Sequence, residues 1–152
     1  MVSSILAGLL VVLCLLAAAM DVRTRRIPNW LNLIVLLGGV SSLFVLPGWS
    51  AIWPHLAHFA IALVLGMALF AMRVWGGGDA KFYASLAMWF PLARAPLLAM
   101  AVALAGLVLV LAYGVWARKH GKASWKQDLP YGVAIAAGGI VLLAIDLSAA
   151  SN

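Results

Sequence analysis

Apolar stretches separated by short polar segments run along the whole chain. The six longest are Val2–Met20, Leu31–Leu46, Ala51–Met72, Phe82–Ala93, Ala95–Ala117 and Leu129–Ile145. A helix that spans a bilayer needs about 17–25 apolar residues. Four of the stretches reach this length, the second falls just short, and the fourth has only 12 residues. The pattern predicts an all-α polytopic membrane protein with about six transmembrane helices, forming one membrane-embedded domain over residues 1–152.

The fourth stretch is the weakest of the six predicted spans. A helix over residues 79–90 would rise about 18 Å, whereas the hydrocarbon core of a bilayer is about 30 Å thick. Pro91 follows directly, and proline kinks or ends a helix. The sequence leaves two possibilities open, a kinked helix that continues through Pro91 or a short helix that stops inside the protein.

Composition agrees with a membrane location, and the charges predict an orientation. The chain is 66% hydrophobic and 9% charged, against about 45–50% apolar and about 25% charged in soluble domains. Nine of the ten Lys and Arg residues fall in the segments 21–30, 73–81 and 118–128, which six spans would place on one side. Cytoplasmic loops carry such an excess. We therefore expect a multi-pass protein of the cell (inner) membrane with both termini extracytoplasmic.

The net charge of +6 does not indicate a nucleic-acid partner. The basic residues lie in short clusters between apolar stretches and do not form one continuous solvated face. We expect Arg23, Arg25 and Arg26 to contact the anionic headgroups of membrane lipids.

The sequence predicts no metal site and no cofactor. Cys14, the only cysteine, lies inside an apolar stretch. His55 and His58 share one helical face, but they have no carboxylate nearby to complete a set of ligands.

Two of the four acidic residues, all of which are aspartates, occupy positions that suggest chemistry. Asp21 closes the first predicted helix and Asp79 opens the fourth, so both lie at the cytoplasmic ends of their helices. Ionisable groups at a membrane are costly and usually have a function and a partner. Two adjacent carboxylates share a proton, so one can activate water while the other protonates or polarises a peptide carbonyl. The pair predicts an aspartic protease whose active site faces the cytoplasm.

Each of these residues also has a structural alternative. Asp79 follows a run of three glycines and could cap a helix that begins at Ala80. Asp21 could pair with Arg25 one turn later. Lys81 fits substrate binding, tuning of Asp79 or a simple topology charge, and the sequence does not separate these.

Three motifs carry a resemblance to a known family. They are Gly76-x-Gly78-Asp79-x-Lys81, Asp21 followed by Ile27-Pro28-Asn29, and, less sharply, Pro130-Tyr131-Gly132. In this order they resemble the signatures of the type IV prepilin peptidases, membrane aspartic peptidases of the GxGD class. The resemblance implies that Asp21 and Asp79 are catalytic, and that the other residues of the first two motifs support the site or bind substrate.

The resemblance also implies a substrate. Such enzymes cut the short basic class III leader peptide from a prepilin or pseudopilin at the cytoplasmic face, just before the hydrophobic helix of the substrate. Long members carry a cysteine-rich insertion after the first span and also N-methylate the new terminus. Only about ten residues occupy this place here. The chain therefore resembles the short, peptidase-only branch of Tad/Flp-type pili, and we expect no methyltransferase activity.

Helix ends suggest how the two aspartates divide the work. A helix N-terminus favours an anion, and a C-terminus disfavours one. On this ground we expect Asp79 to be the base and Asp21 to be the protonated acid, although coupled groups titrate as a pair.

Two other functions remain open. A presenilin-like intramembrane protease shares the Gly-x-Gly-Asp element, but it expects its first aspartate deep in a span beside a tyrosine, whereas Asp21 follows Met20 at a boundary. A small proton- or cation-coupled transporter would show internal repeats and charges at the midplane, and the sequence has neither.

Overall fold

The computed structural model describes residues 2–44, 52–119 and 129–150, and within these ranges the chain is helical with no β-strand. The elements in order are α1 (Val2–Thr24), α2 (Asn29–Leu43), α3 (Trp53–Ala71), α4 (Gly77–Ala87), the 3₁₀ turn η2 (Leu92–Arg94), α5 (Ala95–Lys119) and α6 (Tyr131–Ala150). The predicted all-α class is confirmed. Most of the basic segment 118–128 lies outside the described residues.

Four helices of the described ranges are long and apolar enough to cross a membrane. The spans are Ser4–Thr24, Trp53–Ala71, Leu92–Trp116 and Tyr131–Ala149. They correspond to the four stretches that reach spanning length in the sequence. Helix α2 is apolar but shorter, and α4 is shorter still. The count of six spans and the side on which the termini lie stay predictions.

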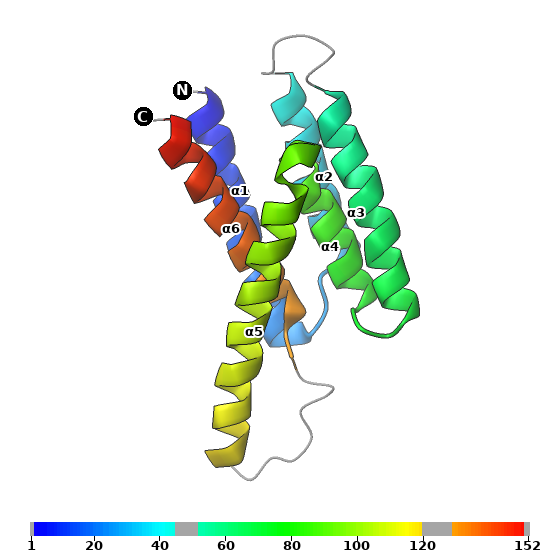
Figure 1. The fold of residues 1–152 in the computed structure, drawn as a ribbon, viewed down its shortest axis with the longest axis vertical. Helices are drawn as coiled ribbons and strands as arrows, with labels where there is room; N and C mark the ends of the chain where they lie inside the picture. The colour runs from blue at the N-terminus through cyan, green and yellow to red at the C-terminus, as the bar shows by residue number, and fades with distance from the viewer. Residues whose placement is uncertain (1, 45–51, 120–128, 151–152) are drawn as a thin grey trace.

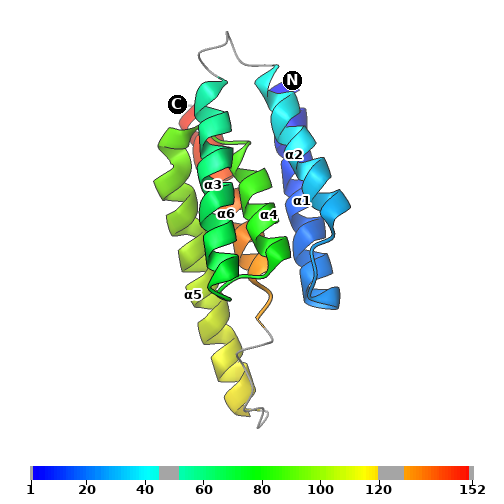
Figure 2. The same cartoon turned by 90° about the vertical axis from the view of Figure 1, so that its right-hand side faces the viewer.

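Helix α4 lies at the centre of the bundle. It packs against α2, α3 and α6, while α5 packs along α6, and α1 packs along α6 and α2 (Figures 1 and 2). Nearly every residue from Ala80 to Ala87 is buried. The last turn of α1 and the first turns of α4 and α6 point to one end of the molecule, opposite the end where α1 begins and α6 finishes (Figure 1).

Glycines on three neighbouring helices let α4 pack this closely. A Cβ added at Gly66 of α3 would lie 3.2 Å from Ala80, and one at Gly139 of α6 would lie 2.7 Å from the Leu86 side chain. Gly39 of α2 faces Met88, just beyond α4, at 3.0 Å. Small residues allow helices in membranes to approach at backbone distance. The glycine pairs at 38–39 and 138–139 thus serve close packing between helices.

Of the two possibilities for the fourth apolar stretch, the second is correct: the stretch forms a short helix that stops before Pro91. Helix α4 ends at Ala87, and the chain turns before Pro91. Two buried histidines of α3 pair with carbonyl oxygens of this turn: Nδ1 of His55 lies 3.0 Å from the Met88 oxygen, and Nδ1 of His58 lies 2.9 Å from the Phe90 oxygen. A carbonyl only accepts, so each Nδ1 carries the proton. The histidine pair therefore satisfies backbone groups that would be costly to leave unpaired in an apolar layer.

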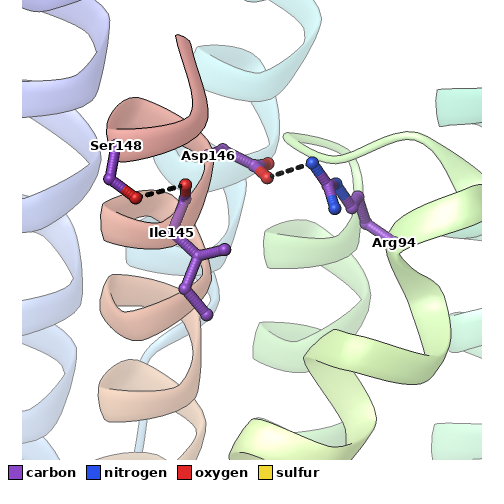
Figure 3. Close-up of polar contacts among 4 residues, drawn as sticks. All are labelled: Arg94, Ile145, Asp146 and Ser148. Atoms are coloured by element: carbon purple, nitrogen blue, oxygen red, sulfur yellow. Dashed lines mark hydrogen bonds and ion pairs between the residues drawn. The ribbon is translucent and has the colours of Figure 1, made fainter. Parts of the chain in front are cut away.

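An ion pair joins α6 to η2 at the end of the molecule away from the aspartates. Arg94 and Asp146 approach to 2.7 Å, and both side chains are partly exposed (Figure 3). Two residues further along α6, the hydroxyl of Ser148 donates to the carbonyl of Ile145 at 2.8 Å. Arg94 is the one Lys or Arg residue outside the three basic segments of the sequence, and here it has an acidic partner.

Candidate active site

The structure brings Asp21 and Asp79 together. Both side chains line two adjoining cavities, of about 340 Å³ and about 280 Å³, at the end of the bundle where α1 finishes and α4 begins. Arg25 and Gly76 also border both cavities. The two aspartates stand 58 positions apart in sequence, so the juxtaposition is a product of the fold.

Asp79 stabilises the start of its own helix. Helix α4 begins at Gly77 with Gly76 as its N-cap, and the Asp79 carboxylate accepts a hydrogen bond from the Gly76 N–H at 3.1 Å. The sequence-based alternative, in which Asp79 itself caps a helix beginning at Ala80, is wrong, because the helix begins three residues earlier, at Gly77. This contact fixes one carboxylate oxygen and holds the side chain over the glycine turn.

The pKa of Asp79 lies well above that of an ordinary aspartate. Burial raises it first, the negative charge of Asp21 raises it further, and the hydrogen bond from Gly76 lowers it, with the pKa reaching about 6. The expectation that the helix N-terminus would favour the anion of Asp79 is wrong in direction. Loss of hydration outweighs the helix dipole at this position.

Asp21 is held by a helix that starts more than a hundred residues later. Its carboxylate is buried and accepts a hydrogen bond from the backbone N–H of Gly132, in the first turn of α6, at 2.7 Å. Asp21 thus lies near the C-terminus of its own helix and also at the N-terminus of another, which stabilises an anion. The local sequence around Asp21 indicates only the first of these two helix ends.

Gly132 has no room for a side chain. A Cβ there would lie 2.8 Å from a carboxylate oxygen of Asp21 and 2.7 Å from the tip of Ile27. The Pro130-Tyr131-Gly132 element therefore has a physical role: it starts α6 and lets the backbone reach the carboxylate. Arg25, whose charge acts on Asp21, directly follows α1 and has a left-handed backbone conformation with φ 55°.

The two sequence motifs contact each other directly. Ile27 is buried, and its carbonyl would lie 3.2 Å from a Cβ at Gly78. Pro28 caps α2, and the Asn29 side chain accepts a hydrogen bond from Lys81 at 2.9 Å. Lys81 thus links α4 to the start of α2, a role that the sequence does not suggest.

Asn32 is a neighbour of the site that the sequence motifs do not include. It is buried in α2, and its amide nitrogen lies 3.4 Å from the Gly78 carbonyl. A polar side chain inside an apolar stretch, one helical turn after Asn29, is the signal that could have identified it. Trp75 and Tyr131 also border the larger aspartate cavity.

This arrangement has the parts that hydrolysis of a peptide bond needs. One carboxylate with a raised pKa can hold a proton beside a second carboxylate that accepts a backbone N–H. Such a pair can take a proton from water and give one to a carbonyl or leaving group. The glycine turn beside Asp79 leaves the backbone accessible to an extended peptide.

Comparison with known proteins gives one family and one relative. Residues 8–111 match the model of the type IV leader peptidase family, and this range includes both aspartates. The chain is 29% identical over 143 residues to the "Prepilin leader peptidase/N-methyltransferase" of Dickeya chrysanthemi, which covers 86% of this chain. The match spans only 47% of that relative, about half of its length. No solved structure matches.

Proposed function

Because this chain belongs to the type IV leader peptidase family, we propose that it is a membrane aspartic endopeptidase that removes the short basic leader of a prepilin or pseudopilin. Asp21 and Asp79 are its catalytic pair. The observation that carries this proposal is that the two carboxylates border the same cavities and that the charge of Asp21 raises the pKa of Asp79. A salt-bridge or capping role alone would not require the two aspartates to meet.

In this proposal Asp79 holds the shared proton and Asp21 is the anion. The raised pKa of Asp79 favours its protonated form, and the Gly132 N–H at the N-terminus of α6, together with the charge of Arg25, offsets part of the cost of burying Asp21 as an anion. Asp21 then takes a proton from the attacking water, while Asp79 donates to the peptide carbonyl. These roles are the reverse of those that the helix ends suggest in the sequence.

The aspartates face the cytoplasm in the proposed topology, with six helices in the inner membrane. The basic residues around the site, including Arg25, Arg26 and Arg73, support this orientation by the positive-inside rule. The fourth helix, α4, then enters the membrane from the cytoplasm and stops inside the bundle.

We also propose that this chain lacks methyltransferase activity. The relative from Dickeya chrysanthemi carries both activities in its name, and the chain matches about half of it. The short connection between α1 and α2, residues 25–28, leaves no room for the cysteine-rich insertion of the long members.

The test is co-expression with a candidate prepilin, followed by mass measurement of the prepilin N-terminus. We expect the wild type to remove the leader and to leave the new terminus unmethylated. Asp21→Ala and Asp79→Ala are expected to leave the leader in place. Asp146→Asn, which changes an aspartate at the opposite end of α6, serves as the control and is expected to cleave. Leader removal by both alanine variants would refute the catalytic pair.

A further inference from the structure

An apolar groove runs from the candidate active site into the membrane-facing part of the bundle. It has a volume of about 420 Å³ and lies between the α3–α4 pair and the α5–α6 pair. On α5 its lining extends from Ala99 to Val110, which corresponds to about 17 Å along the helix axis. The groove therefore follows about half of a hydrocarbon core of about 30 Å.

The groove and the larger aspartate cavity share part of their walls. Val74, Trp75 and Tyr131 line both. Trp75 packs edge-on against Tyr83 of α4, with ring centroids 5.3 Å apart, and Tyr83 also faces the groove. A ligand that occupies the whole groove would thus have one end beside the aspartates.

The walls suit a helix better than a bulky polar ligand. Ala99, Ala103 and Gly106 line the groove from one face of α5, and Gly66 lines it from α3. Residues three and four apart lie on the same side of a helix, and small residues let another helix approach closely in a membrane. Ala103 is exposed, and a Cβ at Gly106 would meet only Ala134, at 3.8 Å.

We propose that the groove binds the hydrophobic helix that follows the leader in the substrate. This inference rests on the proposed function, because a bond cut just before an apolar helix requires that helix to begin at the aspartates and to continue into the membrane. The groove starts at that point, runs in that direction and is apolar over about three helical turns. Docking of the helix places the scissile bond between Asp21 and Asp79.

A matched pair of substitutions on α5 tests the groove. Ala103→Phe fills it, whereas Leu104→Phe changes a neighbouring exposed residue that does not line it. Each variant is given the full-length prepilin in vesicles and a short peptide that covers the cleavage site without the hydrophobic helix. We expect Ala103→Phe to raise the KM for the prepilin about tenfold and to cleave the short peptide as the wild type does. Leu104→Phe is expected to match the wild type on the prepilin.

An unchanged KM of Ala103→Phe for the prepilin would overturn the docking proposal. The same holds if Ala103→Phe and Leu104→Phe impair cleavage of the prepilin equally. Failure of the wild type to cleave the prepilin would instead refute the proposed function, so the two failures are distinguishable.

Photo-crosslinking gives a second, independent measurement. A compact aliphatic residue that carries a diazirine, and that leaves most of the groove open, is placed at position 103 or 104 of the uncleaving Asp79→Ala variant, in vesicles that contain the prepilin. We expect a prepilin adduct from position 103 and none from position 104. An adduct from position 103 with lipid only, or with a second copy of this chain only, would overturn the proposal.

Discussion

At the scale of single residues, the candidate site depends on backbone groups as much as on side chains. The Gly132 N–H lies 2.7 Å from Asp21, and the Gly76 N–H lies 3.1 Å from Asp79. Both donors belong to glycines at the start of a helix. Each carboxylate is therefore positioned by a helix end, and α6 takes part in the site without contributing a charged group there.

Replacement of Gly132 by alanine is expected to disrupt the site while the bundle stays folded. The new Cβ would lie 2.8 Å from a carboxylate oxygen of Asp21, so the carboxylate must move and the hydrogen bond is lost. A displaced catalytic group costs on the order of 100-fold in rate. We expect Gly132→Ala to lower kcat for leader removal by about this factor.

Gly114→Ala is the matched control, because a Cβ at Gly114 of α5 meets nothing within 4 Å. It is expected to cleave at the wild-type rate. Wild-type kcat in Gly132→Ala would show that the Gly132 contact does not position Asp21.

The raised pKa of Asp79 predicts a specific pH dependence. Below about pH 6 Asp79 carries the proton that the proposed mechanism needs, and above it the proton is lost. This group therefore contributes a fall in kcat/KM as pH rises through about 6. Cleavage rates measured across this range test the direction, and a rate that only rises with pH would reverse the proposed roles of the two aspartates.

A direct titration tests the coupling between the two carboxylates. The negative charge of Asp21 is one cause of the raised pKa of Asp79, so Asp21→Asn should lower that pKa while burial still keeps it above the usual value. Isotope-edited infrared spectra of the aspartate carboxyl groups report the titration. An equal or higher pKa of Asp79 in Asp21→Asn would contradict the coupling.

At the scale of elements, the long helices are predictable from sequence, and the end of the shortest one is not. An uninterrupted apolar stretch is a local property, so α1, α3, α5 and α6 can be located from length alone. Helix α4 ends where His55 and His58, about 30 residues earlier, reach the carbonyls of Met88 and Phe90. Such long-range pairing is absent from any local pattern, and the sequence could only leave two possibilities.

The histidines are expected to stabilise the end of α4 through these hydrogen bonds. His58→Leu leaves the buried Phe90 carbonyl without its donor, which costs about 1–3 kcal/mol. His58→Asn keeps an N–H donor near the same position and is expected to lose less. Thermal unfolding in detergent should rank the wild type above His58→Asn and His58→Asn above His58→Leu. Equal loss in both variants would point to ring packing instead of hydrogen bonding.

Some residues of the candidate site can likewise be identified from local sequence, and others cannot. The aspartates could be identified from the sequence because both motifs are local and because alternate helices bring their ends to one side. The donor from Gly132 and the roles of Asn32 and Lys81 depend on contacts between different helices. The proposed acid and base roles depend on burial, which the sequence does not contain, and for this reason the direction expected for the pKa of Asp79 was wrong.

At the scale of the whole molecule, the site and the Arg94–Asp146 ion pair lie at opposite ends of the bundle. Helix α1 runs from one end to the other, with Thr24 near the aspartates, whereas Ser148 lies beside the ion pair. The proposed topology puts these two positions on different sides of the membrane.

Cysteine labelling tests this orientation. Cys14 is buried and can be replaced by alanine, after which Thr24→Cys and Ser148→Cys each provide one reactive thiol. A membrane-impermeant maleimide added to intact cells is expected to label Ser148→Cys, and to label Thr24→Cys only after the membrane is opened. Labelling of Thr24→Cys in intact cells would invert the topology.

The short α4 has a further consequence for the cell. The proposed hydrolase needs water at its catalytic groups, and a water-filled path through the membrane would dissipate the ion gradients across it. Beyond the aspartates, the interior around α4 is filled by fully buried side chains such as Phe82, Leu86 and Leu142. The turn after α4 closes the far end, with Trp89 donating to the Val35 carbonyl at 2.9 Å. In the proposed function, water reaches the aspartates from one side for hydrolysis, while the packing of the described residues beyond them opposes the passage of ions.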